Sequence, residues 1–196
     1  MILAIFDFDG TITTKDSFED FIFYSHGVFK TLWGILVVSP ILVLYVLKIM
    51  PNWKAKQKVF SYFYKGWEKA DFETMAQRYT RERLPTLVRP AALKRLEWHK
   101  QEGHRIVIVS ASFENYLRPW CESFGFELLA TKIDVKDGRL TGQFASKNCF
   151  GEEKVNRLKA AYRLNDFKMI YAYGDSAGDR YLAQIAQKFH YRPFHD

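Results

Sequence analysis

Short apolar runs alternate with amphipathic stretches along most of the chain. The runs at 2–6, 105–110, 127–131 and 168–174 predict buried strands, because they are short and rich in branched and aromatic residues. Stretches with helical periodicity separate them and predict helices over 89–101, 114–124 and 152–162. Strands that alternate with helices are typical of α/β proteins, so the pattern predicts a doubly wound parallel sheet.

Two segments depart from this alternation. Residues 132–144 alternate around Asp137-Gly138, which predicts a β-hairpin with a tight turn at one end of the sheet. The strand that ends near Asp7 and the strand that begins near Arg105 are about ninety residues apart, far more than one crossover needs. We therefore expect a small, mainly helical cap over 16–83, inserted into a core made of 1–15 and 84–196.

The cap contains the most apolar part of the chain, the uncharged run from Thr31 to Leu47 between Lys30 and Lys48. Three readings compete. Pro40 would break a continuous helix, which favours two short helices packed inside the cap. Trp33 and other aromatic residues near the ends favour a hairpin that dips into one leaflet of a membrane. The third hypothesis is a helix that crosses the membrane, because about 17 apolar residues is the lower limit for crossing a bilayer.

Composition and charge narrow the class of protein. The chain of 196 residues is 48% hydrophobic and 26% charged, which is globular. Its net charge of +7 comes from the middle, where residues 48–105 hold 14 Lys or Arg and 6 Asp or Glu. This excess suits anionic substrates, anionic lipid headgroups or nucleic acid, or it is a solvated helix face. The two cysteines predict neither a disulfide framework nor a CxxC metal site, and a cytoplasmic protein without a secretory signal is expected.

Four short motifs carry candidate chemistry, each where a predicted strand ends or a helix starts. They are Asp7-Phe8-Asp9-Gly10-Thr11 after the first strand, Ser110 at the end of the second, Lys154 in the first turn of a helix, and Gly174-Asp175-Ser176-Ala177-Gly178-Asp179 after the run at 168–174. Open α/β sheets bind ligands at the carboxyl ends of their strands. The motifs therefore predict one site.

The acids of these motifs suit a Mg²⁺ ion. We expect Asp7 and Asp175 to ligate it through their side chains and Asp9 through its backbone carbonyl, while Asp179 acts through a water or orients a ligand. A phosphate dianion repels a carboxylate nucleophile, and the ion supplies the positive charge that makes attack feasible.

The remaining polar groups suit a phosphate ester. Lys154, Ser110 and backbone N–H groups near Gly10 are expected to bind the phosphoryl oxygens. Asp7 is the predicted nucleophile, and Asp9 the general acid that protonates the leaving group and later the base that activates water. The alternatives are a phospho-accepting signalling domain and a membrane-associated binding protein without turnover.

These motifs resemble those of the haloacid dehalogenase superfamily of phosphatases: FDFDGT at 6–11, SAS at 110–112, the lysine of GEEKVNRL, and GDSAGD at 174–179. The segment 137–158 is similar to the phosphoserine-phosphatase-like branch, subfamily IB. The resemblance implies a Rossmann-like core, Mg²⁺, a phospho-aspartate intermediate and the roles given above.

Two features bear on the substrate. Asp16 stands nine residues after the nucleophile, where phosphoserine phosphatases tend to carry a glutamate that recognises the substrate amine, so Asp16 is a specificity candidate. The apolar run with Ser39-Pro40 is similar to that of phosphatidylglycerophosphatases of this branch. The expected substrate is a small phosphorylated metabolite or a membrane lipid phosphate, with peripheral contact at the inner face of a membrane through the run from Thr31 to Leu47. No nucleic acid partner is expected.

Overall fold

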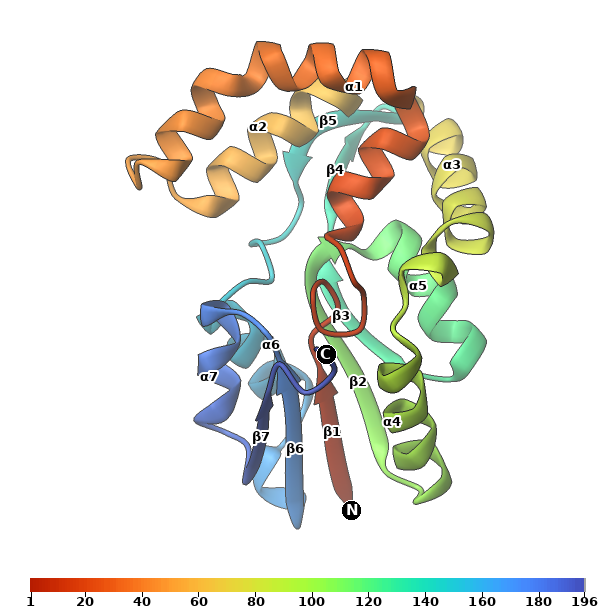
Figure 1. The fold of residues 1–196 in the computed structure, drawn as a ribbon, viewed down its shortest axis with the longest axis vertical. Coiled ribbons are helices and arrows are strands. Elements are labelled where there is room, and N and C mark those ends of the chain that lie inside the picture. Colours follow the sequence, from red (N-terminus) through yellow and green to blue (C-terminus); the bar gives the residue numbers. More distant parts are fainter. Residues whose placement is uncertain (196) are drawn as a thin grey trace.

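Five parallel strands form the central sheet of the computed structural model, which describes residues 1–195 (Figure 1). Their order is β3-β2-β1-β6-β7, with β1 at the centre. The strands are β1 (Ile2–Phe6), β2 (Arg105–Phe113), β3 (Glu127–Thr131), β6 (Met169–Gly174) and β7 (Lys188–Tyr191). The predicted α/β class, the parallel sheet and four of these strands are confirmed. The edge strand β7 was not predicted, because its four residues KFHY include a lysine and a histidine and no branched aliphatic side chain.

Helices cover both faces of the sheet, as a doubly wound fold requires (Figure 1). Alternate residues of β1 point to opposite faces. Ala4 and Phe6 belong to the core beneath α4 (Pro90–Gln101) and α5 (Glu114–Phe124). Leu3 and Ile5 belong to a second core with residues of α6 (Glu152–Ala161) and α7 (Arg180–Ala183). The run at 2–6 is apolar throughout because both of its faces are buried.

Above the carboxyl ends of the strands lies a layer of three helices, α1 (Ser17–Val46), α2 (Asn52–Tyr64) and α3 (Lys69–Glu82), followed by the short turn η1 (Leu84–Leu87) (Figure 1). The insertion after the first strand is thus helical, as predicted. Its proposed limits at 16 and 83 stay a prediction, and residue 196, the last of the proposed core, lies outside the described part.

The predicted hairpin forms from β4 (Ile133–Lys136) and β5 (Arg139–Phe144), but not at one end of the main sheet. It is a separate antiparallel pair that packs beside α2. The N–H of Gly66 donates to the carbonyl of Leu140 (2.8 Å), and the N–H of Leu140 donates to the carbonyl of Trp67 (2.9 Å). The insertion therefore meets a second, distant segment of the chain.

Helix α1 continues through Pro40, so the predicted break there is wrong. Proline lacks the N–H that would bond to the carbonyl of Leu36, but the Ser39 hydroxyl donates to that oxygen instead (2.7 Å). The helix bends at Gly27, which has non-helical angles (φ 75°, ψ 169°). The run from Thr31 to Leu47 is consequently almost all one helical segment, not a hairpin.

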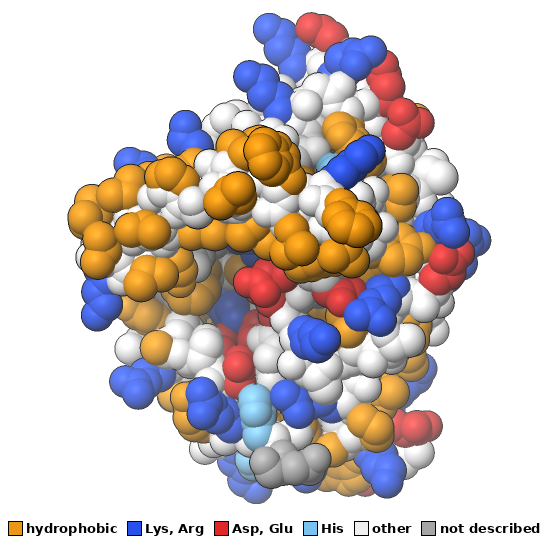
Figure 2. All heavy atoms as spheres, turned by 45° about the horizontal axis from the view of Figure 1, so that its top comes forward, with side chains coloured by type: hydrophobic (Ala, Val, Ile, Leu, Met, Phe, Trp, Pro, Cys, Tyr) orange, Lys and Arg blue, Asp and Glu red, His pale blue; other side chains and the backbone are white. Residues whose placement is uncertain are grey.

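This outer segment of α1 has one buried side and one bare side. Thr31 and Val38 are buried, and Gly34 lies so close to α2 that a Cβ there would be 2.4 Å from the Phe63 ring. Figure 2 shows apolar side chains gathered along the opposite side. We call this the outer face of α1; its exposed residues are Val28, Phe29, Leu32, Trp33, Leu36, Val37, Val43, Leu44, Val46 and Leu47.

Candidate active site

Asp7 directly follows β1, and its side chain faces Lys154, which lies in the first turn of α6. The Lys154 Nζ lies 2.5 Å from Oδ1 of Asp7 and 2.5 Å from Oδ1 of Asp179, and all three side chains are buried. Helix α6 begins directly after Gly151, which has a positive φ of 62°. The structure thus brings three of the predicted site residues into direct contact.

Charge balance at this centre sets the ionisation of its groups. Burial raises the pKa of Asp7 well above its ordinary value, against the pull of Lys154, and Asp179 adds to the rise. Burial alone would lower the pKa of Lys154, but Asp7 and Asp179 outweigh it and raise that pKa. Burial would likewise raise the pKa of Asp179, yet Lys154 and Ser176 lower it. Lys154 therefore forms ion pairs with two neighbouring carboxylates, those of Asp7 and Asp179.

Asp175 completes a cluster that suits a divalent cation. Carboxylate oxygens of Asp7, Asp175 and Asp179 all lie within 4.8 Å of one another. The Thr11 hydroxyl lies between two of them, 3.3 Å from Oδ2 of Asp7 and 3.2 Å from Oδ1 of Asp175. Oxygen ligands are what Mg²⁺ prefers, and here three carboxylates stand beside a single lysine. The residues present fit the ion.

Asp179 is also the residue that holds the loop around Asp175. Its Oδ2 accepts hydrogen bonds from the Ser176 hydroxyl (2.7 Å), the Ser176 N–H (3.0 Å) and the Asp175 N–H (3.2 Å). A Cβ on Gly174 would lie 2.4 Å from the Cβ of Asp179, so only glycine fits there. The GDSAGD motif is therefore a compact turn that aims Asp175 at Asp7.

Asp9 is held away from the lysine by three donors. Its Oδ2 accepts from the hydroxyls of Ser112 (2.6 Å) and Ser110 (3.2 Å), and its Oδ1 accepts from the N–H of Ser17 at the start of α1 (2.7 Å). The fully buried Ser110 was predicted to bind phosphate; here its hydroxyl contacts Asp9 and accepts the N–H of Ser112 (2.9 Å). Phosphate binding by Ser110 stays a prediction.

Sequence reasoning gave Ser112 and Ser17 no role, although Ser112 is part of the SAS motif. Residues two apart on a strand point to the same side, so the pair Ser110 and Ser112 could have been read as one device. The residue type of Ser17 could not predict its contact with Asp9, because the backbone N–H makes this contact.

Gly10 and Asp16 lie in the loop between β1 and α1. Gly10 has a φ of 80°, and a Cβ there would lie 2.3 Å from Oδ2 of Asp175. Asp16 caps α1, accepting the N–H groups of Phe18 (2.8 Å) and Glu19 (3.0 Å) through Oδ1. Burial, then the charge of Asp9, raises the pKa of Asp16. The proposed specificity residue thus has a structural task as well.

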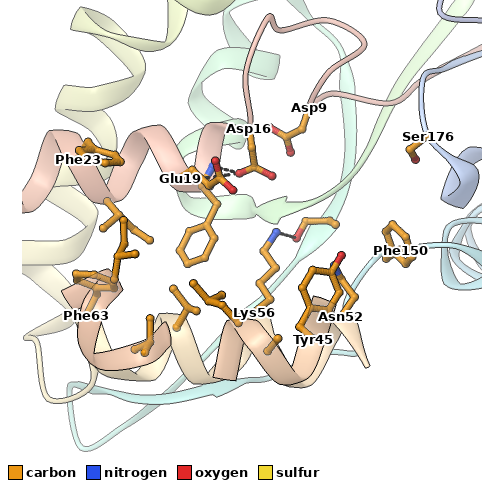
Figure 3. A pocket seen from close by; sticks show the side chains of 18 of the residues that line it. Asp9, Asp16, Glu19, Phe23, Tyr45, Asn52, Lys56, Phe63, Phe150 and Ser176 are labelled. Atoms are coloured by element: carbon orange, nitrogen blue, oxygen red, sulfur yellow. Dashed lines mark hydrogen bonds between the residues drawn. The ribbon is translucent and has the colours of Figure 1, made fainter. Parts of the chain in front are cut away.

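A cavity of about 500 Å³ runs from these acids into the helical layer (Figure 3). One end is lined by Asp7, Asp9, Lys154, Asp175 and Ser176. The other end is apolar, between α1 and α2, and is lined by Ile22, Phe23, Ile35, Val38, Leu42, Val59 and Phe63. The cavity is therefore suited to a molecule with a charged head and an apolar body.

A polar belt separates the two ends of the cavity. Figure 3 shows Asp16 and Glu19 on one side and Lys56 and Asn52 on the other. The Lys56 Nζ donates to the carbonyl of Ala111 (3.1 Å) and lies 5.3 Å from the centre of the Phe18 ring. Among the described residues that line the cavity, Lys56 and Lys154 are the basic ones. Lys56 ties α2 to β2 at the edge of the site.

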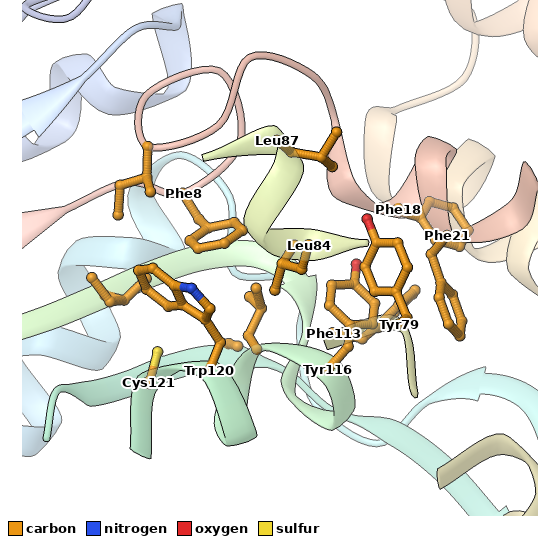
Figure 4. Close-up of a cluster of buried hydrophobic side chains, with 14 of the residues drawn as sticks. Phe8, Phe18, Phe21, Tyr79, Leu84, Leu87, Phe113, Tyr116, Trp120 and Cys121 are labelled. Carbon is orange, nitrogen blue, oxygen red and sulfur yellow. The ribbon is translucent and has the colours of Figure 1, made fainter. Parts of the chain in front are cut away.

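An aromatic cluster lies beneath the segment that carries Asp7 and Asp9, and Figure 4 shows its residue Phe8 beside Trp120. Phe8, between Asp7 and Asp9, points away from the cavity and packs edge-on against Trp120 of α5 (5.2 Å between ring centres). Nearby, the Tyr79 hydroxyl of α3 donates to the carbonyl of Ser17 (3.1 Å). The DFD segment and the start of α1 are thereby fixed by one buried cluster.

Comparison with known proteins identifies the class. The family profile of haloacid dehalogenase-like hydrolases matches residues 4–184, and the chain belongs to this family. It is 34% identical over 195 residues to protein CicA of Caulobacter vibrioides, covering 98% of this chain and 86% of CicA. A probable phosphatase of Mycobacterium tuberculosis is 32% identical over 117 residues, which cover 58% of this chain and 40% of that protein.

Solved structures agree on the fold. A protein of unknown function from Bordetella pertussis Tohama I has a TM-score of 0.83 at 22% identity, covering 96% of this chain and 88% of that one. A substrate-bound phosphoserine phosphatase has a TM-score of 0.70 at 19% identity, covering 96% and 84%. The predicted family and the hydrolase class are confirmed.

Proposed function

We propose that the chain is a Mg²⁺-dependent phosphomonoester hydrolase that works through a phospho-aspartate on Asp7. The observation that carries this proposal is the separation of two acids within one loop: Asp7 pairs with Lys154, while Asp9 is held by serines on the other side. This separation supports different roles for the two carboxylates, Asp7 as the nucleophile and Asp9 as the group that transfers a proton. When bound by Asp7, Asp175 and the Asp9 carbonyl, Mg²⁺ would offset the charge of the phosphate.

The chain's residues then act in two stages. A carboxylate oxygen of Asp7 attacks phosphorus, the bond to the ester oxygen breaks, and protonated Asp9 gives its proton to the departing oxygen. In the second stage Asp9 takes a proton from a water that attacks the same phosphorus. The bond between phosphorus and Asp7 breaks, which releases phosphate and restores both acids. Lys154 binds the phosphoryl oxygens throughout.

The cavity supports a lipid phosphate, such as phosphatidylglycerophosphate, over a small polar metabolite. Beyond the polar belt its walls are aliphatic and aromatic, which suits the acyl chains of a lipid and has no counterpart in a small polar metabolite. Asp16, at the position of the amine-binding glutamate in phosphoserine phosphatases, already accepts two backbone N–H groups. A lipid substrate resides in a membrane, so this proposal requires peripheral contact at its cytoplasmic face, and the run from Thr31 to Leu47 is the candidate surface.

Hydrolysis of an aryl phosphate tests the chemistry. We expect activity that depends on Mg²⁺ and falls at least about 1,000-fold in Asp7→Asn, because the nucleophile is lost. The matched control Asp166→Asn removes an exposed acid and should retain full activity. Full activity of Asp7→Asn would overturn the mechanism. An enzyme that becomes phosphorylated without releasing phosphate would instead be the signalling domain considered as the alternative.

A substrate panel tests the specificity. Phosphatidylglycerophosphate in detergent micelles, phosphoserine and a polyol phosphate are compared by kcat/KM. We expect the lipid to be preferred by at least about 100-fold, because its acyl chains extend over the apolar wall. Preference for phosphoserine or the polyol phosphate would refute the lipid assignment and leave the phosphatase chemistry standing.

A further inference from the structure

The outer face of α1 is an apolar surface that is open to solvent. It carries ten apolar residues that are at least 36% exposed, and Phe29 reaches 90%. Soluble proteins rarely leave contiguous apolar patches of this extent in water, unless a partner covers them. Figure 2 shows that the patch continues along the helix.

The helix that carries this face is anchored to the rest of the protein. The bend at Gly27 turns α1 across the top of the layer, and its inner side packs on α2 at Gly34, while the buried Thr31 and Val38 line the cavity. At Gly34 the backbone of α1 lies directly against the Phe63 ring of α2, with no room for a Cβ. The segment has the length and hydropathy of a membrane span, yet its inner side is committed to the protein. A surface-lying mode fits this arrangement, because only one side is free.

Charge indicates what covers the face. Residues 21–67 contain six lysines and no Asp or Glu. Lys30 and Lys48 bracket the apolar run, and Lys54 and Lys58 are exposed on α2. Trp33 and Trp53, 64% and 45% exposed, add the amphipathic rings that favour a membrane interface. A second copy of this chain would meet the face with the same positive charge, whereas an anionic lipid surface is complementary to it.

The cavity connects the active site to this face. Ile35 and Tyr45 line the cavity and are also 38% and 41% exposed, so they lie at its rim on α1. Their helix neighbours Leu36, Leu44 and Val46 belong to the outer face. An apolar tail leaving the cavity therefore emerges beside the patch.

We propose that the outer face of α1, with the exposed lysines that flank it, docks the protein on an anionic bilayer with α1 lying in the plane of the interface. The cavity then opens at the level of the lipid headgroups. The docking itself is independent of turnover. The entry of substrate from the bilayer rests on the lipid phosphatase function proposed above.

Flotation of the full chain with lipid vesicles tests the docking. One set of vesicles is phosphatidylcholine alone, and the other contains about 30% phosphatidylglycerol. We expect the protein to float with the anionic vesicles and to be released at high salt, because screening weakens the lysine contribution. The variant Phe29→Gln/Leu36→Gln/Val43→Gln changes exposed residues that do not line the cavity, and its bound fraction should fall at least tenfold.

Two further variants separate charge from fold. Lys48→Glu/Lys54→Glu should lose binding to anionic vesicles, whereas Lys94→Glu/Lys159→Glu, an equal reversal on exposed positions of α4 and α6, should float like the natural protein. Each variant must hydrolyse a soluble aryl phosphate at the natural rate, which shows that it is folded.

The remaining outcomes are decisive. Failure of the natural protein to float, or unchanged flotation of the triple variant, overturns the docking proposal. Elution as a dimer that the triple variant converts to a monomer assigns the face to a second copy and overturns it too. Flotation of Asp7→Asn like the natural protein is expected. Normal docking with a preference for phosphoserine would refute the lipid substrate alone.

Discussion

The Ser112 hydroxyl lies 2.6 Å from Oδ2 of Asp9, the shortest of the three contacts that hold this acid. We predict that Ser112→Ala lowers kcat about 10- to 100-fold with little change in KM, since proton transfer by a positioned group contributes on this scale. Steady-state kinetics with an aryl phosphate measure both constants. Ser112→Thr should restore activity, and Ser123→Ala, whose hydroxyl donates to the carbonyl of Trp120 (2.7 Å), is the control. An equal loss in kcat and thermal stability, with no rescue by threonine, would assign Ser112 a structural role alone.

Removal of Asp175 should abolish the response of the protein to magnesium. An ion that binds only the folded state adds about 2.7 kcal/mol of stability at 100 times its Kd. We therefore expect millimolar Mg²⁺ to raise the Tm of the natural protein after treatment with a chelator. Asp175→Asn should lose this rise, while Asp166→Asn keeps it. A Tm that is insensitive to Mg²⁺ in the natural protein would count against the ion site.

The buried His99 makes folding stability depend on pH. Burial, with the nearby His104, lowers the pKa of His99 to about 3, and its Nε2 lies 2.9 Å from the Tyr173 hydroxyl. The unfolded chain protonates this residue near pH 6.5 and the folded chain does not, so the unfolded state binds more protons between about 6.5 and 3. Stability should fall as the pH drops through this window, by up to about 2 kcal/mol at pH 5.

Urea unfolding at pH 7 and pH 5 measures this difference. The variant His99→Gln should show a smaller loss between the two pH values than the natural protein. The exposed His195→Gln variant is the control. An identical loss in all three proteins would exclude His99 as its origin.

Gly10→Ala should damage the site and the fold together. The φ of 80° costs a residue with a Cβ about 1–2 kcal/mol, and that Cβ would lie 2.3 Å from Oδ2 of Asp175. We expect lower stability and at least about 10-fold lower activity, because Asp175 must move. Unfolding and aryl phosphate assays report the two effects. The control is Gly103→Ala, which has a similar φ of 67° but open space around the Cβ, and it should lose stability without loss of kcat.

The fold and the acid cluster were predictable because both follow from local patterns. An apolar strand that is followed by Asp7 and Asp9 predicts a place in a parallel sheet. The turn at Asp137-Gly138 predicts the hairpin. The orientation of Asp9 was not predictable, since it depends on where α1 begins and on an irregular pairing of β2 beyond Ser110. The helix break predicted at Pro40 was wrong for a similar reason, because a particular hydrogen bond decided the outcome. The Ser39 hydroxyl donates to the Leu36 carbonyl that the missing N–H of Pro40 leaves free, and hydropathy does not register this bond.

The bend at Gly27 separates two parts of α1 that have different contacts. On one side of it, the first turns hold Asp9 through Ser17 and are fixed in the aromatic cluster; on the other, the helix presents its bare side to the surroundings. The backbone is non-helical at Gly27, so the two parts of α1 are not one continuous rod. Substitutions on the outer face of α1 can therefore change where the enzyme binds without changing the rate at which it hydrolyses its substrate.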